Sequence, residues 1–154
     1  MIRDQIHAVL LALHGDSLLL PNVAVAEVLS RDALQPSGSG PPWLLGHCMW
    51  NARSVPVVRF ETLNCPGDEP DPRRERIVVL HSVGAHLPSG HLALVIQGYP
   101  HLVTLNRSAL RPAALDPVDR DELILARVQI ASQMTAIPDL ETIEAEIARA
   151  QMAR

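Results

Sequence analysis

The sequence is poor in aromatic and charged residues, and it contains no lysine. Aromatic residues make up 3% of the 154 positions, so a core has to be built from leucine, valine, isoleucine and alanine. All 13 basic residues are arginines, and the formal net charge is −4. No cluster of these arginines is interleaved with aromatic residues, which gives nucleic-acid binding little support. Hydrophobic residues make up 47%, which is typical of a globular protein and excludes a disordered chain.

Cysteines and long apolar runs are also scarce. Cys48 and Cys65 do not make a disulfide framework, and we expect Cys48 to be buried because it lies in an apolar run. No run approaches the roughly 18 apolar residues that a membrane span needs. The apolar stretch 8–13 follows no net positive charge and has no small-residue cleavage site, so it is a poor signal peptide. We therefore expect a cytoplasmic protein with no direct membrane insertion.

The stretch Trp43–Leu63 is the most informative part of the chain. Two apolar runs flank a break at residues 51–53, and the second run contains Val55, Val57 and Val58, whose branched side chains favour a strand. Pro56 has no N–H to donate, so we expect the second run at a sheet edge or a bulge. The stretch predicts two strands joined by a short turn.

The same pattern recurs eighty positions later. Residues 123–143 align with residues 43–63 without a gap, and Phe60-Glu61-Thr62-Leu63 falls on Leu140-Glu141-Thr142-Ile143. Few positions are identical, so chance similarity is the alternative to a tandem duplication. The order of elements favours duplication, because each half reads strand, turn, strand, break, strand, loop, hairpin.

The remaining strands are predicted from apolar runs between turn residues: Ile6–His14, Ser17–Leu20, Val23–Leu29, Arg76–Val83, His91–Tyr99 and His101–Leu105. Residues 33–42 and 111–122 are predicted loops, and the polar segment 66–76 is the best internal boundary. Alternation in the third strand places Val23, Val25, Glu27 and Leu29 on one face.

The C-terminal segment predicts a helix. Asp139 is a suitable N-cap, and Leu140, Ile143 and Ile147 form an apolar stripe at helical spacing. The helix should therefore pack on a sheet or cover a barrel mouth.

No catalytic, cofactor-binding or metal-binding pattern stands out. Residues 37–40 lack the lysine and the strand–turn–helix setting of a phosphate-binding loop. His81, His86 and His91 recur every five residues, which does not place them on one face of a helix or strand, and no further ligand completes a zinc set. We expect no enzyme, no cofactor and no metal, although a small β-barrel enzyme or ligand-binding protein with an unrecognised site is an alternative.

The central stretch resembles bacterial chemotaxis coupling proteins of the CheW type. These carry a glycine, a short apolar run, a turn ending in Arg-Gly, and an apolar-Pro-apolar-apolar run. Gly46, Trp50, Val55-Pro56-Val57-Val58 and Phe60 follow that pattern, and residues 25–28 resemble the family's Val-x-Glu-Val segment. The resemblance covers most of the chain and is strongest over residues 18–63.

Three positions depart from the family pattern. Asn51 and Ala52 stand where the family has the turn's arginine and glycine, and Arg59 replaces a usual acidic residue. The family arginine is implicated in receptor–kinase coupling, so its absence puts contact at this turn in doubt. The pattern Trp-Leu-Leu-Gly…Trp…Pro-Val-Val-x-Phe-Glu is more similar to the ChpC-like branch of type IV pilus chemosensory systems.

The resemblance implies a mainly β fold of two five-stranded SH3-like barrels packed side by side, with a C-terminal helix. It divides one CheW-like domain into a first barrel at 1–66, a linker at 67–76 and a second barrel with the helix at 77–154. It also implies a non-catalytic adaptor that couples the cytoplasmic tip of a methyl-accepting chemoreceptor to the regulatory domain of a CheA-like histidine kinase. The protein would then be recruited to membrane-associated receptor arrays, and the ChpC-like pattern implies regulation of twitching motility.

Carried over by position, the resemblance places five residues at the receptor- and kinase-facing surface: Val25, Glu27, Val28, Asn51 and Ala52. Val25 and Val28 could equally be core residues, and Glu27 could be a solvated edge residue. A scaffold or decoy that joins the array without activating the kinase is the alternative that Asn51 and Ala52 suggest.

Overall fold

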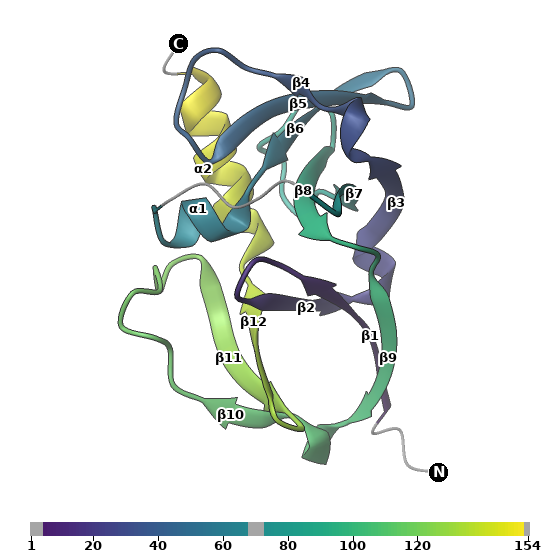
Figure 1. Ribbon diagram of the computed structural model, residues 1–154, viewed down its shortest axis with the longest axis vertical. Coiled ribbons are helices and arrows are strands. Elements are labelled where there is room, and N and C mark those ends of the chain that lie inside the picture. The colour runs from purple at the N-terminus through teal and green to yellow at the C-terminus, as the bar shows by residue number, and fades with distance from the viewer. Residues whose placement is uncertain (1–4, 68–72, 153–154) are drawn as a thin grey trace.

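The computed structural model describes residues 5–67 and 73–152, which form two six-stranded sheets and two α-helices (Figure 1). We call them sheet A, with strand order β10-β11-β12-β2-β1-β9, and sheet B, with order β3-β7-β8-β6-β5-β4. The mainly β class and the C-terminal helix are confirmed. Each sheet has six strands in the described part of the chain, rather than the five expected, because short strands form inside the two predicted loops.

The strands of sheet A are β1 (Gln5–Ala12), β2 (Ser17–Pro21), β9 (His101–Asn106), β10 (Arg111–Ala113), β11 (Ile124–Ile130) and β12 (Gln133–Pro138). Those of sheet B are β3 (Val25–Ser30), β4 (Gln35–Pro36), β5 (Leu44–Trp50), β6 (Arg53–Val58), β7 (Glu75–His81) and β8 (His91–Gln97). The helices are α1 (Phe60–Asn64) and α2 (Leu140–Met152), with 3-10 turns η1 (Asn22–Ala24), η2 (Arg31–Ala33) and η3 (Arg107–Ala109).

The two halves of the chain exchange hairpins. The N-terminal β1–β2 hairpin joins sheet A, where β1 pairs with β9 and β2 with β12. The β7–β8 hairpin of the second half joins sheet B, where β7 pairs with β3 and β8 with β6. The assignment of one barrel to 1–66 and the other to 77–154 is therefore wrong at the level of the sheets. The expected linker 67–76 lies partly outside the described residues, and its last two positions belong to β7.

The internal repeat is confirmed as a structural repeat. Strand β5 starts at Leu44 and β11 at Ile124, which is 124 − 44 = 80 positions later, and the paired strands β6 and β12 and helices α1 and α2 start with the same offset. A second similarity, Arg-x-Ala-Leu-x-Pro at 31–36 and 107–112, was not recognised in the sequence. It forms the equivalent turns η2 and η3 and the short strands that follow them.

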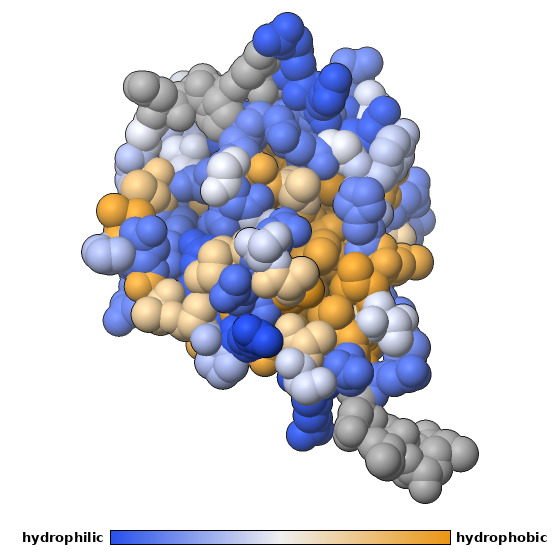
Figure 2. Space-filling model, turned by 60° about the horizontal axis from the view of Figure 1, so that its bottom comes forward, coloured by the Kyte–Doolittle hydropathy of each residue, from blue (hydrophilic) through white to orange (hydrophobic). Residues whose placement is uncertain are grey.

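Three apolar clusters hold the fold together. The largest lies between the sheets and includes Val9, Leu20, Leu80, Leu94 and Ile143. A second fills the inside of sheet B, where Cys48 is fully buried as expected. The third, inside sheet A, has three buried residues and a larger rim of half-buried ones. With this end of the molecule turned forward, apolar side chains gather in one area of the surface (Figure 2).

Helix α2 matches its prediction and α1 was missed. Asp139 caps α2 by accepting a hydrogen bond from the Thr142 N–H at 3.2 Å, and the stripe of Leu140, Ile143 and Ile147 is buried. Residues 60–63 were predicted to continue the β hairpin, but they lie in the short helix α1. The residues aligned with them, 140–143, are also helical and form the start of α2. Neither helix of the described ranges reaches the length and apolarity needed to cross a bilayer.

Two local strand predictions are corrected. Pro56 does not lie on an edge strand, because β6 pairs with both β5 and β8. The pairing with β8 starts only at Val57, so Pro56 has a paired neighbour on the β5 side alone, and its missing N–H breaks no bond to β8. Residues 22–24 form η1, so β3 starts at Val25 rather than Val23. Pro21 precedes this turn, and its missing N–H is compatible with the interruption.

A buried ion pair joins the two halves. Arg59 and Glu75 are 1% and 5% exposed, and both terminal nitrogens of the guanidinium donate to the carboxylate. The carboxylate also accepts hydrogen bonds from His14 Nε2 at 2.9 Å and from Arg31 Nε at 3.3 Å. Burial alone would raise the pKa of Glu75, but the hydrogen bonds from Arg59, His14 and Arg31 hold it below its ordinary value. Glu75 is therefore a buried anion whose charge is compensated by both sheets.

Removing the cation should leave that anion uncompensated. We expect Arg59→Met to lower the free energy of unfolding by about 3–5 kcal/mol at neutral pH, measured by urea denaturation. Arg53→Met is the matched control, because Arg53 is exposed and should change stability by no more than about 1 kcal/mol. Equal losses in the two variants would contradict the importance of the buried pair.

Candidate protein-binding site

The predicted site residues of β3 lie on two different faces. A bulge between Val25 and Glu27 shifts the strand register, so Val25 and Val28 lie opposite Leu80 and Val78, which belong to the inter-sheet core. Glu27 lies opposite Val79, which faces the inside of sheet B. Simple alternation grouped Val25 with Glu27, which is wrong because the bulge inserts one extra residue.

Glu27 is exposed and links the edge strand β3 to strand β5 of the same sheet. Its Oε1 accepts a hydrogen bond from Trp50 Nε1 at 3.0 Å, although β3 and β5 are separated by three strands in the sheet order. Sheet B must therefore curl so that strands β3 and β5 approach each other. Trp50 also packs against the ring of His91, with centroids 4.6 Å apart. Glu27, Trp50 and His91 thus form one surface cluster, which we call the β3–β5 cluster.

The β5–β6 turn lies beside the β3–β5 cluster. Asn51 and Ala52 are exposed and have φ angles of 52° and 62°, the left-handed conformation of a tight hairpin turn. Asparagine tolerates this conformation, whereas alanine costs roughly 1 kcal/mol relative to glycine there. Arg53, just after the turn, donates to the Ser89 carbonyl at 3.1 Å and ties the turn to the β7–β8 loop. The structure therefore brings Glu27, Asn51 and Ala52 to one end of sheet B.

The other face of β3 continues onto sheet A. Val9 lies opposite Leu20 on one side and Leu102 on the other, so the three side chains form a row on the face of sheet A that points to the inter-sheet core. Val9 and Leu20 are buried, but Leu102 is 78% exposed at the end of the row. Val25 and Val28 are half-buried against the same core. Leu102 was not predicted, because alternation in β9 does not show which residue lies beyond the core's edge.

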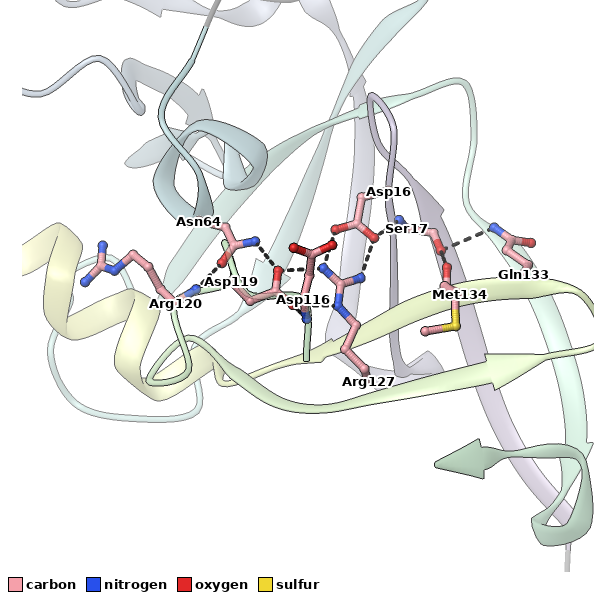
Figure 3. A network of polar contacts seen from close by, with 9 residues as sticks. All are labelled: Asp16, Ser17, Asn64, Asp116, Asp119, Arg120, Arg127, Gln133 and Met134. Atoms are coloured by element: carbon pink, nitrogen blue, oxygen red, sulfur yellow. Dashed lines mark hydrogen bonds and ion pairs between the residues drawn. The ribbon is translucent and has the colours of Figure 1, made fainter. Parts of the chain in front are cut away.

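A polar network connects the two halves on the opposite side of the inter-sheet core (Figure 3). Arg127, 8% exposed, donates two hydrogen bonds to Asp16 at 2.7 and 3.0 Å and two to Asp119 at 3.0 and 2.8 Å. Asn64 of α1 donates to Asp119 at 2.9 Å and accepts from the Arg120 N–H at 2.8 Å. The hydrogen bonds from Arg127 lower the pKa of Asp119 to about 2. Asp119 is therefore permanently ionised near neutral pH and unsuited to proton transfer.

The network forms one wall of a pocket of about 470 Å³. His14, Glu61 and Cys65 also line it. Both ring nitrogens of His14 are occupied, Nε2 by Glu75 and Nδ1 by Gln97 at 3.0 Å, so His14 presents no free base. Arg127 is saturated by carboxylates and has little capacity for an anionic ligand. Most polar groups of this pocket are thus engaged in holding the fold, whereas Glu61 Oε1 is buried and accepts no hydrogen bond from the described residues.

The histidines that suggested a metal are only partly brought together. His81 and His91 are directly opposite on β7 and β8, with ring centroids 5.1 Å apart. His86 lies in the intervening loop. Within residues 5–67 and 73–152, no group of three or more histidine, cysteine or acidic side chains is arranged to hold a metal ion.

Two comparisons with known proteins found a match, one for the sequence and one for the structure. The family model of the CheW-like domain matches residues 7–147. The structure is similar to the crystal structure of the scaffolding protein TtCheW from Thermoanaerobacter tengcongensis, with a TM-score of 0.74 and 13% sequence identity over 92% of this chain and 89% of that chain. No curated protein sequence matches this chain significantly.

The polar network predicts a defined acid sensitivity. Because the pKa of Asp119 is about 2 in the folded protein and 3.8 is its ordinary value, its contribution to stability is complete above about pH 4 and is lost as pH falls towards 2. We expect Asp119→Asn to be less stable than the natural chain at pH 7 and to lose less stability between pH 4 and 2. Urea denaturation at a series of pH values measures both. Parallel pH profiles for the two proteins would contradict the assignment.

Proposed function

We propose that this chain, which belongs to the CheW-like domain family, is a non-catalytic adaptor that couples the cytoplasmic tip of a chemoreceptor to the regulatory domain of a chemosensory histidine kinase. The observation that carries the proposal is the family match over residues 7–147, which spans both sheets and the part of α2 up to residue 147. An adaptor needs exposed contact surfaces on a rigid frame. The two sheets, joined by the His14–Glu75 contact and by the Asn64–Asp119 bond of the Arg127 network, supply such a frame.

Two surfaces suit two different contacts. Leu102, exposed at the end of its row, and the half-buried Val25 and Val28 are apolar, so an amphipathic receptor helix can place its apolar face on them. The β3–β5 cluster is polar and carries the exposed carboxylate of Glu27. Its charge suits an arginine or lysine of the receptor or the kinase. We therefore assign Val25 and Val28 to one contact, and Glu27, Asn51 and Ala52 to a second.

We further propose that the array controls type IV pilus twitching motility. The support is the pattern Trp43-Leu-Leu-Gly46, Trp50 and Pro56-Val-Val-x-Phe-Glu61, which resembles the ChpC-like branch. The chain would act in the cytoplasm at membrane-associated receptor arrays, since both partners meet there.

A scaffold or decoy that does not activate the kinase is the second candidate. Asn51 and Ala52 replace the family's arginine and glycine at a turn that is fully exposed and lies beside Glu27. Such a protein would occupy an array position without transmitting the signal. The pocket beside Arg127 gives less support to an enzyme, because Arg127, Asp16 and Asp119 already compensate one another.

The charge of Glu27 should matter for binding. We expect Glu27→Arg to weaken co-purification with the receptor tip or the kinase regulatory domain about tenfold, because it reverses an exposed charge. The melting curve should change little, since one exposed hydrogen bond contributes about 1 kcal/mol at most.

Two variants serve as controls for Glu27→Arg. Glu27→Gln keeps an acceptor for Trp50 while removing the charge, so it should also weaken binding. Glu141→Arg makes the same change on the exposed start of α2 and should leave binding intact. Unchanged binding in Glu27→Arg would remove Glu27 from the contact surface.

Substitutions at the β5–β6 turn distinguish an active adaptor from a decoy. In a reconstituted mixture of receptor, kinase and adaptor, an active coupler should raise kinase autophosphorylation, and Asn51→Arg with Ala52→Gly should raise it further by restoring the family turn. A decoy would bind but fail to stimulate until both substitutions are made. Binding to neither partner would exclude both readings.

A further inference from the structure

Three of the four strands at the sheet edges carry features that discourage pairing with another chain. Strand β4 has two residues and contains Pro36, and β10 has three residues and contains Arg111 and Pro112. Strand β3 has a bulge and the exposed charge of Glu27. Short length, proline, bulges and charge are the usual ways in which an edge is kept unpaired.

Strand β9 lacks all of these features. It has six residues, pairs with β1 in unbroken register from His101 to Asn106, and contains no proline, arginine, aspartate or glutamate. In the described part of the chain β1 is its only paired strand. Leu102 is 78% exposed on it. The free edge of β9 therefore presents unpaired backbone groups along a largely uncharged strand.

Among the described residues, arginines flank this edge at both ends. Before β9, the guanidinium of Arg76 lies 4.2 Å from the ring centroid of Tyr99. After it come Arg107 in η3 and Arg111 in β10, neither of which forms an ion pair with the described residues. Residues 98–113 contain no aspartate or glutamate. A strand laid along β9 would have uncharged residues at its centre and positive charge near each of its ends.

We propose that the free edge of β9 is a docking site for an extended strand of a partner protein, uncharged at its centre and bearing carboxylates at both ends. Backbone hydrogen bonds supply the pairing, and the flanking arginines select the acidic ends. A second copy of this chain fits less well, because antiparallel β9–β9 pairing brings Arg107 of one copy towards Arg76 of the other. This proposal does not depend on the receptor and kinase contacts proposed above.

A synthetic peptide tests the proposal on the full chain. The probe has alternating valine and threonine at its centre and two aspartates at each end; a second peptide has lysines in place of the aspartates. Binding is followed by backbone amide NMR shifts and by hydrogen exchange of β9. We expect the acidic peptide to shift the β9 amides and slow the exchange of alternate ones. We expect the basic peptide to bind about tenfold more weakly, and salt to reduce the difference.

Matched variants locate the binding. Leu102→Glu puts a negative charge on the edge strand and should abolish binding of the acidic peptide. Leu125→Glu makes the same change at a residue that is 65% exposed on β11, which is paired on both sides, and should leave binding within about twofold. Thr104→Glu on β9 is a second edge variant should Leu102→Glu fold poorly. Thermal unfolding checks all three.

Several results would overturn the proposal. These are the absence of shifts at millimolar acidic peptide, shifts outside β9, equal binding of the acidic and basic peptides, and equal loss in Leu102→Glu and Leu125→Glu. A dimer of the chain in sedimentation that Leu102→Glu dissociates would overturn it in favour of a second copy.

Discussion

The buried contact between Arg59 and Glu75 is the constraint on which the arrangement of the two halves depends. Arg59 ends the hairpin of the first half and Glu75 begins that of the second. His14, from the β1–β2 turn that joins sheet A, and Arg31, from η2 beside sheet B, donate to the same carboxylate. A buried carboxylate that accepts four hydrogen bonds from three residues of different elements can be satisfied in few arrangements of those elements. The Glu75 carboxylate therefore specifies that the β1–β2 turn, η2 and the end of β6 meet at the start of β7.

The exchange of hairpins explains why the molecule is one unit rather than two. Each sheet is completed by a hairpin from the other half, so neither half can bury its apolar strands alone. The largest apolar cluster lies between the sheets and includes α2, and the Arg127 network closes the same junction on its polar side. Surfaces that combine both halves of the chain, such as the row that ends at Leu102, exist only because the halves are held in this relation. A rigid frame of this kind can bind two proteins at once without moving its own elements, as the proposed adaptor role requires.

Local patterns predicted most elements but not how they combine. Apolar runs between turn residues gave the longer strands, and the spacing of Leu140, Ile143 and Ile147 gave α2. Helix α1 was missed although the alignment of residues 60–63 with the start of α2 contained the signal. The short strands at 35–36 and 111–113 were missed because two or three residues carry no periodicity. In the candidate site, Glu27, Asn51 and Ala52 are together as the resemblance implied, whereas the bulge at β3 turned Val25 and Val28 to the other face.

The sequence by itself determined the class of the fold, the internal repeat and the capped C-terminal helix, because these depend on local periodicity and on residues close along the chain. The family followed from the resemblance of its motifs to those of known proteins. Only the tertiary structure decided which hairpin completes which sheet, since the two halves carry equivalent hairpins and either sheet offers an edge to both. It also decided the roles of Arg59 and Arg127, whose partners lie 16 and 111 positions away. Long-range pairing of charges depends on the burial that folding itself creates, so a local sequence pattern does not predict it.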